Sequence, residues 1–398
     1  MDLTLYPRRL QGTVAAIPSK SMTHRYLICA ALADKPTDIF CHQTSLDMDA
    51  TARCLCALGA EIEKTDFGYR VSPICKIPKK ATLDCGESGS TLRFLLPIVG
   101  ALGVHGTFLL AGRLAQRPLT SLWEEMERMG CQLSRPAENS ILCQGKLTAG
   151  TYQVSGNISS QYITGLLFAC TLIPGSSTLS ITSTLESAPY VRMTEAALED
   201  FGISTNYDAL QYAFPYHSPG KICVEGDWSN AAFFFAANTL GSDIQINGLN
   251  DNSTQGDKAI SKILSILEQK PVIDATDIPD LVPILAVAAG VKQGATFINI
   301  RRLRMKESDR VASVAAMLTA LGLHVDVEEN QMTVHPGTYK STLIDSQNDH
   351  RIAMAAAIAA TVADGPVTIT NAQCVDKSYP QFWDIYKQLG GQYEQYIR

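Results

Sequence analysis

Positively charged side chains, with hydroxyls and glycines beside them, are the residues of this chain best suited to chemistry on anions. Arginine forks onto phosphate and carboxylate oxygens, and lysine acts as a compact point charge. Glycine lets a backbone approach a ligand closely. The set comprises Lys20, Ser21, Arg25, Ser88, Gly89, Ser90, Arg93, Arg113, Arg117, Ser159, Ser160, Gln161, Arg302, Arg304, Lys306, Arg310, His350, Arg351 and Lys377. These residue types predict a site for small, multiply charged anions.

Two carboxylates stand among these cations, and each has two readings. Asp280 precedes an apolar run, and Glu307 lies between Lys306 and Arg310. As structural residues, Asp280 would cap a helix, and Glu307 would be a first-turn carboxylate that the helix dipole stabilises. As functional residues, they would be a general base and a general acid, tuned by burial and by the cations. The sequence leaves both readings open.

Single cations also have ordinary explanations. Arg310 would pair with Glu307 in a structural ion pair, and Lys377 would be a solvated loop residue. The recurrence of cations at equivalent places, in a chain whose net charge is −6, favours the functional reading.

The elements that must position these residues show a repeat. Six segments begin with Ser, Asn, Asp or Pro and continue as small apolar residues, most of them starting about 70 residues after the one before. They are 19–32, 88–102, 159–172, 229–240, 279–290 and 348–360. Because they are apolar nearly all round, they predict buried helices.

Amphipathic helices and short strands fill the intervals. The expected surface helices are 47–60, 118–130, 189–202, 255–269, 307–322 and 379–391, and the expected strands include 11–16, 106–112, 178–183, 242–248, 324–329 and 366–372. Each unit of about 65 residues then holds one buried helix, one surface helix and several strands, so that six units form two domains of three. A buried helix keeps a partial positive charge at its N-terminus, so several such ends predict an anion-binding cleft.

Composition excludes several other classes of protein. With 33 Lys and Arg against 39 Asp and Glu, the chain lacks the basic balance of a nucleic-acid or anionic-membrane binder. The eleven cysteines are scattered without a C-x-x-C pair, which predicts buried reduced thiols and no zinc site. We find no signal peptide and no apolar stretch long enough to span a membrane, so we expect a cytoplasmic protein.

Nine short motifs, in order, resemble those of one enzyme family. They are 18–25 (PSKSMTHR), 86–93 (GESGSTLR), 114–118 (LAQRP), 155–162 (SGNISSQY), 187–190 (SAPY), 278–280 (IPD), 305–310 (MKESDR), 348–351 (NDHR) and 376–380 (DKSYP). In this the chain is similar to the 3-phosphoshikimate 1-carboxyvinyltransferases, also called 5-enolpyruvylshikimate-3-phosphate (EPSP) synthases. The match spans nearly the whole chain.

The resemblance implies an α/β (α+β) fold of two domains. Each would contain three βαβαββ units with buried parallel helices, an inside-out α/β barrel. The expected N-terminal domain is 19–226, and residues 1–18 with 227–398 form the C-terminal one, hinged by two crossovers near residues 18 and 226. The active site is expected in the cleft between them.

The resemblance also implies which residues contact the two substrates. Shikimate 3-phosphate would contact Lys20, Ser21, Arg25, Ser159, Ser160, Gln161, Ser187, Tyr190, Asp280 and Lys306. Phosphoenolpyruvate would contact Lys20, Gly89, Arg117, Gln161, Arg310, His350, Arg351 and Lys377. Asp280, Glu307 and Lys20 would be catalytic in an addition and elimination through a tetrahedral intermediate. We expect no metal, no organic cofactor, no nucleic-acid or membrane partner, and a monomer.

Two positions depart from the family pattern, and three rival functions stay open. Glu87 and Arg302 stand where Asn is usual, which puts one substrate contact in doubt. A UDP-N-acetylglucosamine enolpyruvyl transferase would share the fold, but its first motif has Lys-Asn where Lys20 and Ser21 stand. The other rivals are a non-catalytic phospho-ligand binding protein, which Asp280 and Glu307 argue against, and an RNA-processing enzyme, which the acidic balance disfavours.

Overall fold

The computed structural model describes residues 1–396 and divides the chain into two compact units. The central unit is Pro18–Val224, and the split unit combines Met1–Ile17 with Glu225–Arg398. The chain therefore passes from the split unit into the central unit and back again. Each unit has its own apolar core.

Six sheets form among the described residues, three in each unit, and each contains one parallel pair of strands. In four of the sheets, a buried helix connects the two parallel strands, as α3 connects β6 to β7. This is the connection that parallel neighbours require, because a short hairpin cannot join them. The mixed α/β class predicted from the sequence is confirmed.

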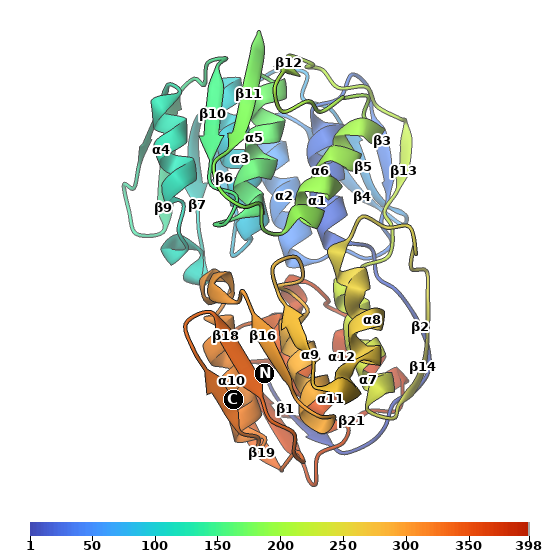
Figure 1. Ribbon diagram of the computed structural model, residues 1–398. Helices are drawn as coiled ribbons and strands as arrows, with labels where there is room; N and C mark the ends of the chain where they lie inside the picture. The colour runs from blue at the N-terminus through green and yellow to red at the C-terminus, as the bar shows by residue number, and fades with distance from the viewer. Residues whose placement is uncertain (397–398) are drawn as a thin grey trace. The chain divides into compact units, whose positions relative to one another are not determined.

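The central unit arranges its sheets around the buried helices α1, α3 and α5 (Figure 1). Its strands are β3 (Thr37–Phe40), β4 (Glu61–Thr65), β5 (Gly68–Ser72), β6 (Lys80–Asp84), β7 (His105–Leu109), β8 (Cys131–Ser134), β9 (Ser140–Gly145), β10 (Thr151–Val154), β11 (Ser176–Ile181), β12 (Leu210–Gln211) and β13 (Lys221–Cys223). Its helices are α1 (Lys20–Ala31), α2 (Leu46–Ala57), α3 (Gly89–Leu102), η1 (Gly112–Gln116), α4 (Thr120–Arg128), α5 (Ser160–Thr171) and α6 (Ala188–Asp200).

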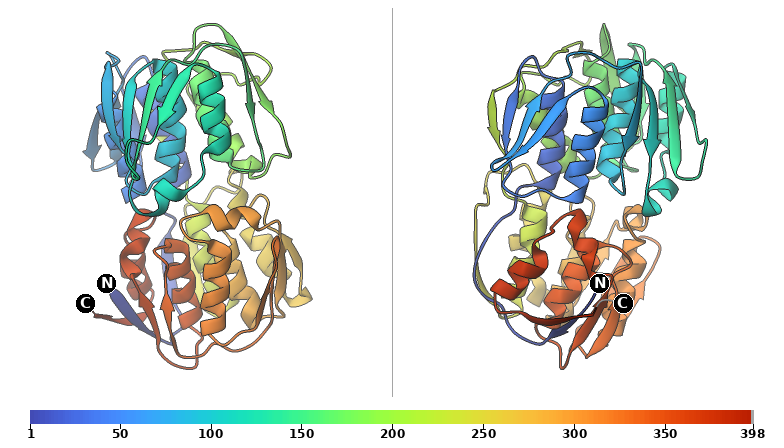
Figure 2. Two further views of the ribbon diagram at one scale, coloured as in Figure 1. Left: turned by 90° about the vertical axis from the view of Figure 1, so that its left-hand side faces the viewer. Right: turned by 180° about the vertical axis from the view of Figure 1, so that it is seen from behind.

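The split unit repeats this plan around α7, α9 and α11, as the two further views show (Figure 2). Its strands are β1 (Asp2–Tyr6), β2 (Gln11–Ala15), β14 (Asp243–Asn247), β15 (Val272–Asp274), β16 (Ala295–Ile298), β17 (Val325–Val327), β18 (Gln331–Val334), β19 (Thr342–Asp345), β20 (Val367–Thr370) and β21 (Gln392–Tyr396). Its helices are α7 (Trp228–Thr239), η2 (Gly256–Ala259), α8 (Ile260–Ser265), η3 (Leu267–Gln269), α9 (Val282–Val291), η4 (Arg301–Met305), α10 (Arg310–Ala320), α11 (His350–Ala360), η5 (Ala372–Lys377) and α12 (Phe382–Gln388).

The two passages of the chain exchange strands between the repeats. Strand β2 precedes α1 in the sequence but pairs in parallel with β14 of the split unit. Strand β13 precedes α7 but pairs in parallel with β3 of the central unit. The pairing of β2 with β14 and of β13 with β3 therefore joins strands from distant parts of the chain in one sheet of each unit, and β1 does the same in a second sheet of the split unit by pairing with β20 and β21.

The six buried helices form where the apolar runs predicted them, and polar caps open most of them. The side chains of Ser19, Ser88, Ser159, Asp227 and Asp349 each accept a hydrogen bond from a backbone N–H of the first turn. These bonds satisfy donors that a helix start otherwise leaves unpaired.

Several helix boundaries differ from the sequence prediction. Helix α7 is capped by Asp227, two residues before the expected start at Ser229, because the carboxylate reaches the N–H of Asn230 at 2.8 Å. Helix α9 starts at Val282, so the helix-capping reading of Asp280 is wrong. Helix α10 starts at Arg310 behind its cap Asp309, which leaves Glu307 outside the first turn. The single helix expected over 255–269 is broken into three short pieces.

The structure also shows the state of the cysteines and the lengths of the apolar helices. All eleven cysteines are free thiols, and eight of them are buried, while Cys56, Cys75 and Cys223 are exposed. Across residues 1–396, no helix combines the length and the apolar content that crossing a bilayer demands.

Candidate functional site

The carboxylate of Asp280 is the centre of a cation cluster in the split unit. Its Oδ1 accepts from Nη1 of Arg310 at 2.8 Å and lies 3.4 Å from Nζ of Lys306. Its Oδ2 accepts from Nη2 of Arg351 at 2.9 Å. The loop before α9, the start of α10 and the start of α11 thus meet at one carboxylate.

Arg310 connects this carboxylate to two others. The buried guanidinium donates to Oε2 of Glu307 at 2.6 Å and from Nε to Oδ2 of Asp349 at 3.0 Å. Burial opposes its charge, but Asp349, Glu307 and Asp280 outweigh burial and raise the pKa of Arg310. Its positive charge is therefore permanent and its position is set by three partners.

Asp349 both caps α11 and holds Arg310. It accepts from the N–H of Arg351 at 3.0 Å and from the hydroxyl of Ser308 at 3.0 Å. Burial alone would raise the pKa of Asp349, but the neighbouring Arg310 lowers it overall. The cap therefore fixes His350 and Arg351 at the first turn of a buried helix.

Lys306 and Lys377 bring two ammonium groups to the loops before α9 and α11. Burial lowers the pKa of Lys306, and Asp280 opposes this effect. Lys377, at the end of η5, donates to the carbonyl oxygen of Asn348 at 2.8 Å, directly before the cap of α11. These contacts place Lys377 beside the start of α11.

A buried carboxyl lies behind the cluster. Asp257 accepts from the hydroxyl of Ser229 at the start of α7. Burial, followed by the negative charge of Asp280, raises the pKa of Asp257 to about 7, although Arg351 acts in the opposite direction. The sequence gives no signal for this residue beyond its place in an expected helix.

In the central unit, Lys20 is the first residue of α1 and forms an ion pair with Asp47 of α2. Its Nζ lies 2.8 Å from Oδ2 of Asp47, and both side chains are mostly buried. Ser21 follows Lys20, and its carbonyl oxygen accepts from Nη1 of Arg25 at 2.6 Å. Sequence reasoning did not select Asp47, which lay in a helix expected to face solvent.

Arg25 joins α1 to α5 and α6. Its guanidinium donates to the carbonyl oxygen of Tyr190 at 2.7 Å and to the hydroxyl of Thr194 at 2.8 Å. Burial lowers its pKa to about 10, which still leaves it charged at neutral pH. The backbone of Ser187, which precedes α6, is left-handed at φ 57°, and its side chain is buried. These contacts group Arg25, Ser187 and Tyr190 around the start of α6.

The starts of α3 and α5 bring two further arginines together. A β-carbon at Gly89 would lie 2.6 Å from Nη1 of Arg93 and 2.7 Å from Nη1 of Arg117. Arg93 donates to Oε1 of Gln161 at 3.2 Å, and Nε2 of Gln161 donates to Oγ of Ser90 at 2.9 Å. The absence of a side chain at Gly89 is what allows both guanidinium groups to approach its backbone.

Ser159 and Ser160 open α5 beside Gln161. Ser159 is the cap, accepting from the N–H of Gln161 at 3.3 Å, and Ser160 is the first helical residue and is buried. The hydroxyl of Ser159 therefore caps α5 in addition to any contact with a ligand.

Arg93 is the strongest candidate that the predicted contact set omitted. The sequence placed it on the helix after Gly89, and its spacing of one turn from Gly89 was the available signal. It is 3% exposed and lies over the ring of Tyr162 with Cζ 5.9 Å from the centroid.

The two departures from the family pattern take different positions. The carboxylate of Glu87 packs over the backbone of Gly112, where a β-carbon would lie 2.5 Å from Oε2. Arg302 is 8% exposed and donates to the carbonyl oxygen of Thr276 at 2.7 Å, in the loop that leads to Asp280. Arg302 therefore supports the loop that carries Asp280.

One group with metal-ligand chemistry was not expected. His324, Asp326 and His335 place their ligand atoms within 4.8 Å of one another. Asp326 follows His324 by two residues and precedes His335 by nine. This spacing brings the three side chains together only because β17 pairs with β18.

Comparison with known proteins identifies relatives over the full chain. A family model described as EPSP synthase (3-phosphoshikimate 1-carboxyvinyltransferase) matches residues 6–386. The 3-phosphoshikimate 1-carboxyvinyltransferase of Clostridium acetobutylicum is 40% identical over 413 residues, covering 97% of this chain and 96% of the relative. That of Clostridium beijerinckii is 37% identical over 430 residues and covers 99% of each.

Solved structures share the fold. The chain is similar to EPSP synthase from Acinetobacter baumannii with a TM-score of 0.79 at 21% identity, covering 99% of this chain and 100% of that one. It is also similar to the enolpyruvyl transferase NikO from Streptomyces tendae, with a TM-score of 0.76 at 17% identity, covering 99% and 98%. Agreement at such low identity concerns the fold alone.

Proposed function

The chain belongs to the EPSP synthase family, and from this premise we infer that it transfers the enolpyruvyl group of phosphoenolpyruvate to the 5-hydroxyl of shikimate 3-phosphate and releases phosphate. The observation that carries the inference is the match of the family model over residues 6–386, with relatives named for this activity that cover nearly the whole chain. The activity makes the chain a transferase of the shikimate pathway.

The charges of the site residues suit this pair of substrates. Both substrates are multiply negative, and the cation cluster of the split unit holds two arginines and a lysine around a single carboxylate. A substrate carboxylate or phosphate is chemically similar to the Asp280 side chain that these cations now contact. Binding would therefore exchange one set of charge-assisted hydrogen bonds for another.

We assign the acceptor substrate to residues of both units. Shikimate 3-phosphate contacts Lys20, Ser21, Arg25, Ser159, Ser160, Gln161, Ser187 and Tyr190 of the central unit and Asp280 and Lys306 of the split unit. The central-unit residues surround the starts of α1, α5 and α6, where helix N-termini favour phosphate.

Phosphoenolpyruvate is assigned to the remaining cations. It contacts Lys20, Gly89, Arg117 and Gln161 of the central unit and Arg310, His350, Arg351 and Lys377 of the split unit. We add Arg93 as a positioning residue, because it donates to Gln161 and lies against Gly89.

The reaction proceeds by addition and then elimination. The 5-hydroxyl oxygen attacks C2 of phosphoenolpyruvate while its proton passes to Asp280, and C3 gains a proton from Glu307 with Lys20 assisting. The resulting tetrahedral intermediate returns a proton from C3 to the Glu307 carboxylate and loses phosphate by C–O cleavage, while the proton held by Asp280 passes to the departing phosphate. These steps restore the enol ether and both carboxylates. Arg117, Arg310, Arg351 and Lys377 stabilise the negative charge that this sequence concentrates on phosphate and carboxylate.

The deciding experiment measures phosphate release from phosphoenolpyruvate, with shikimate 3-phosphate in one tube and UDP-N-acetylglucosamine in another. We expect release only with shikimate 3-phosphate. Release only with the nucleotide sugar would support phosphoenolpyruvate as the donor substrate and contradict shikimate 3-phosphate as the acceptor. If folded protein releases no phosphate in either tube, the result would favour a non-catalytic phospho-ligand binding protein.

We further propose that the enzyme works as a cytoplasmic monomer. Eleven free thiols are consistent with a reducing compartment. Light scattering coupled to size-exclusion chromatography measures the mass of the protein in solution. A value near twice 43.1 kDa would contradict the monomer.

A further inference from the structure

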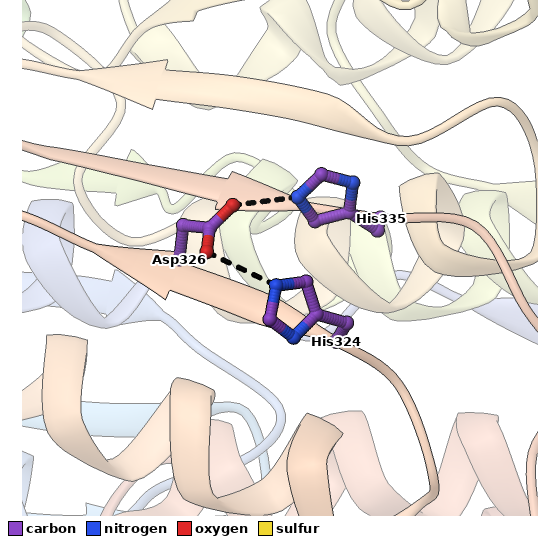
Figure 3. A group of neighbouring side chains, drawn as sticks. All are labelled: His324, Asp326 and His335. Atoms are coloured by element: carbon purple, nitrogen blue, oxygen red, sulfur yellow. Dashed lines mark hydrogen bonds and ion pairs between the residues drawn. The ribbon is translucent and has the colours of Figure 1, made fainter.

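Two histidines and an aspartate form a cluster on the β17–β18 hairpin of the split unit (Figure 3). His324 directly precedes β17 and His335 directly follows β18. The backbone N–H of His335 donates to the carbonyl oxygen of His324 at 3.0 Å, which makes the two residues a cross-strand pair. Asp326 lies two residues beyond His324 on the same strand.

The alternation of the strands brings the three side chains to one face. Met332 and Val334 of β18 are buried, so the residues that alternate with them, Thr333 and His335, lie on the opposite face. His324 stands opposite His335, and Asp326 stands opposite Thr333. The side chains of His324 and Asp326 are 73% and 56% exposed, and that of His335 is 36% exposed, so an ion can reach the cluster from solvent.

Two of the three pairs of ligand atoms already have spacings close to those around one metal ion, and all three atoms lie within 4.8 Å of one another. Nε2 of His324 lies 3.1 Å from Oδ1 of Asp326, and Nε2 of His335 lies 2.7 Å from Oδ2. Around a tetrahedral zinc ion with bonds of about 2.0–2.2 Å, neighbouring ligand atoms are about 3.3 Å apart. Small side-chain rotations would convert two hydrogen bonds to the carboxylate into three bonds to one ion.

We propose that His324, Asp326 and His335 bind a divalent late first-row metal ion such as Zn²⁺. Imidazole nitrogens with one carboxylate oxygen are a donor set that suits zinc and its neighbours, and water completes the coordination. The three residues have no part in the proposed reaction. An ion there would hold the edge strand β17 against β18, because its ligands come from both arms of the hairpin.

The test is a calorimetric titration of chelator-treated full-length protein with Zn²⁺, repeated with His335→Gln and Asp326→Asn. We expect one ion per chain in the unaltered protein and at least about tenfold weaker binding in each variant. His217→Gln is the matched control, since His217 is also exposed and pairs with Asp34 at 3.0 Å but is not in the three-residue cluster. Zn²⁺ should raise the melting temperature of the unaltered protein and of this control only.

A second titration with Co²⁺ identifies the ligands. Binding through nitrogen and oxygen gives weak visible bands without the strong near-ultraviolet thiolate band that Cys56, Cys75 or Cys223 would add. Zn²⁺ affinity unchanged in His335→Gln, a thiolate band, or no binding at all would overturn the proposal and leave Asp326 as a hydrogen-bonded bridge between two histidines.

Discussion

The guanidinium of Arg351 donates to the carboxylate of Asp280 at 2.9 Å, which joins the start of α11 to the loop before α9. The two residues are 71 positions apart in the chain. A second donor, Arg310, reaches the other oxygen of the same carboxylate at 2.8 Å. The proposed base and two proposed donor-substrate ligands are therefore one electrostatic unit, and changing any of them alters the others.

Asp280→Asn tests the base. The amide keeps the size of the side chain but cannot accept the hydroxyl proton, so we expect turnover to fall about 10²–10⁴-fold with both substrates still bound. Steady-state kinetics and calorimetric binding measure the two quantities. Asp384→Asn, an exposed position at the start of α12, is the control and should retain full turnover. Near-normal turnover of Asp280→Asn would remove the base assignment.

Arg351→Ala tests the donor-substrate site. Loss of a charge-assisted contact costs about 1.5–3 kcal/mol, so the KM for phosphoenolpyruvate should rise about 10–100-fold. Folding should survive, because Arg310 and Lys306 still contact Asp280. Arg301→Ala removes an arginine that is 67% exposed and paired with Glu329, and it should leave KM unchanged. An unaltered KM in Arg351→Ala would exclude this residue from the site.

Gly89→Ala tests the close approach of two guanidinium groups. The added methyl would lie 2.6 Å from Arg93 and 2.7 Å from Arg117, and both contacts are to the ends of flexible side chains. We therefore expect a nearly unchanged melting temperature and a KM for phosphoenolpyruvate raised at least about tenfold by displaced cations. Thermal melting beside kinetics separates these effects, and a normal KM would mean that Arg117 does not need its present position.

Gly165→Ala tests the packing beneath that site. A β-carbon at Gly165 would meet the carbonyl oxygen of Arg93 and approach Cγ of Pro97 at 3.0 Å, on the neighbouring helix α3. Backbone cannot rotate away as a side chain does, so we expect a loss of about 1–3 kcal/mol in the free energy of unfolding. Urea denaturation measures it. The control is Ser261→Ala, on the exposed side of α8, which should change the free energy of unfolding little. Gly220→Ala would not serve as a control, because the φ of 79° at Gly220 would add backbone strain.

Asp257→Asn tests the buried carboxyl. Its pKa of about 7 exceeds the value of about 3.9 in an unfolded chain, so the folded protein binds more protons between these values. Its contribution to stability is therefore present at low pH and is lost as pH rises to about 7. The stability of Asp257→Asn relative to the unaltered protein should increase by about 3 kcal/mol between pH 4.5 and pH 8.

Urea denaturation at the two pH values measures this difference, and Asp251→Asn, on an exposed turn of the same loop, is the control. A difference that stays constant with pH would show that Asp257 is already ionised in the folded protein.

Sequence alone determined the features that depend on neighbouring residues. The apolar runs after Ser19, Ser88 and Ser159 became buried helices, because a helix that is apolar all round is stable only inside a core. The same local pattern placed Lys20, Gln161 and Arg351 at helix starts, and the ordered motifs indicated the family.

Tertiary structure decided which of these residues meet. The sequence left Asp280 open as a cap or a base, and its partners Arg310 and Arg351 come from 30 and 71 residues away. Arg93 gained its place through the contact of α3 with α5, and His324 met His335 only through the pairing of β17 with β18. Helix caps are short-range contacts that sequence spacing encodes, whereas ion pairs between distant segments depend on how the layers pack.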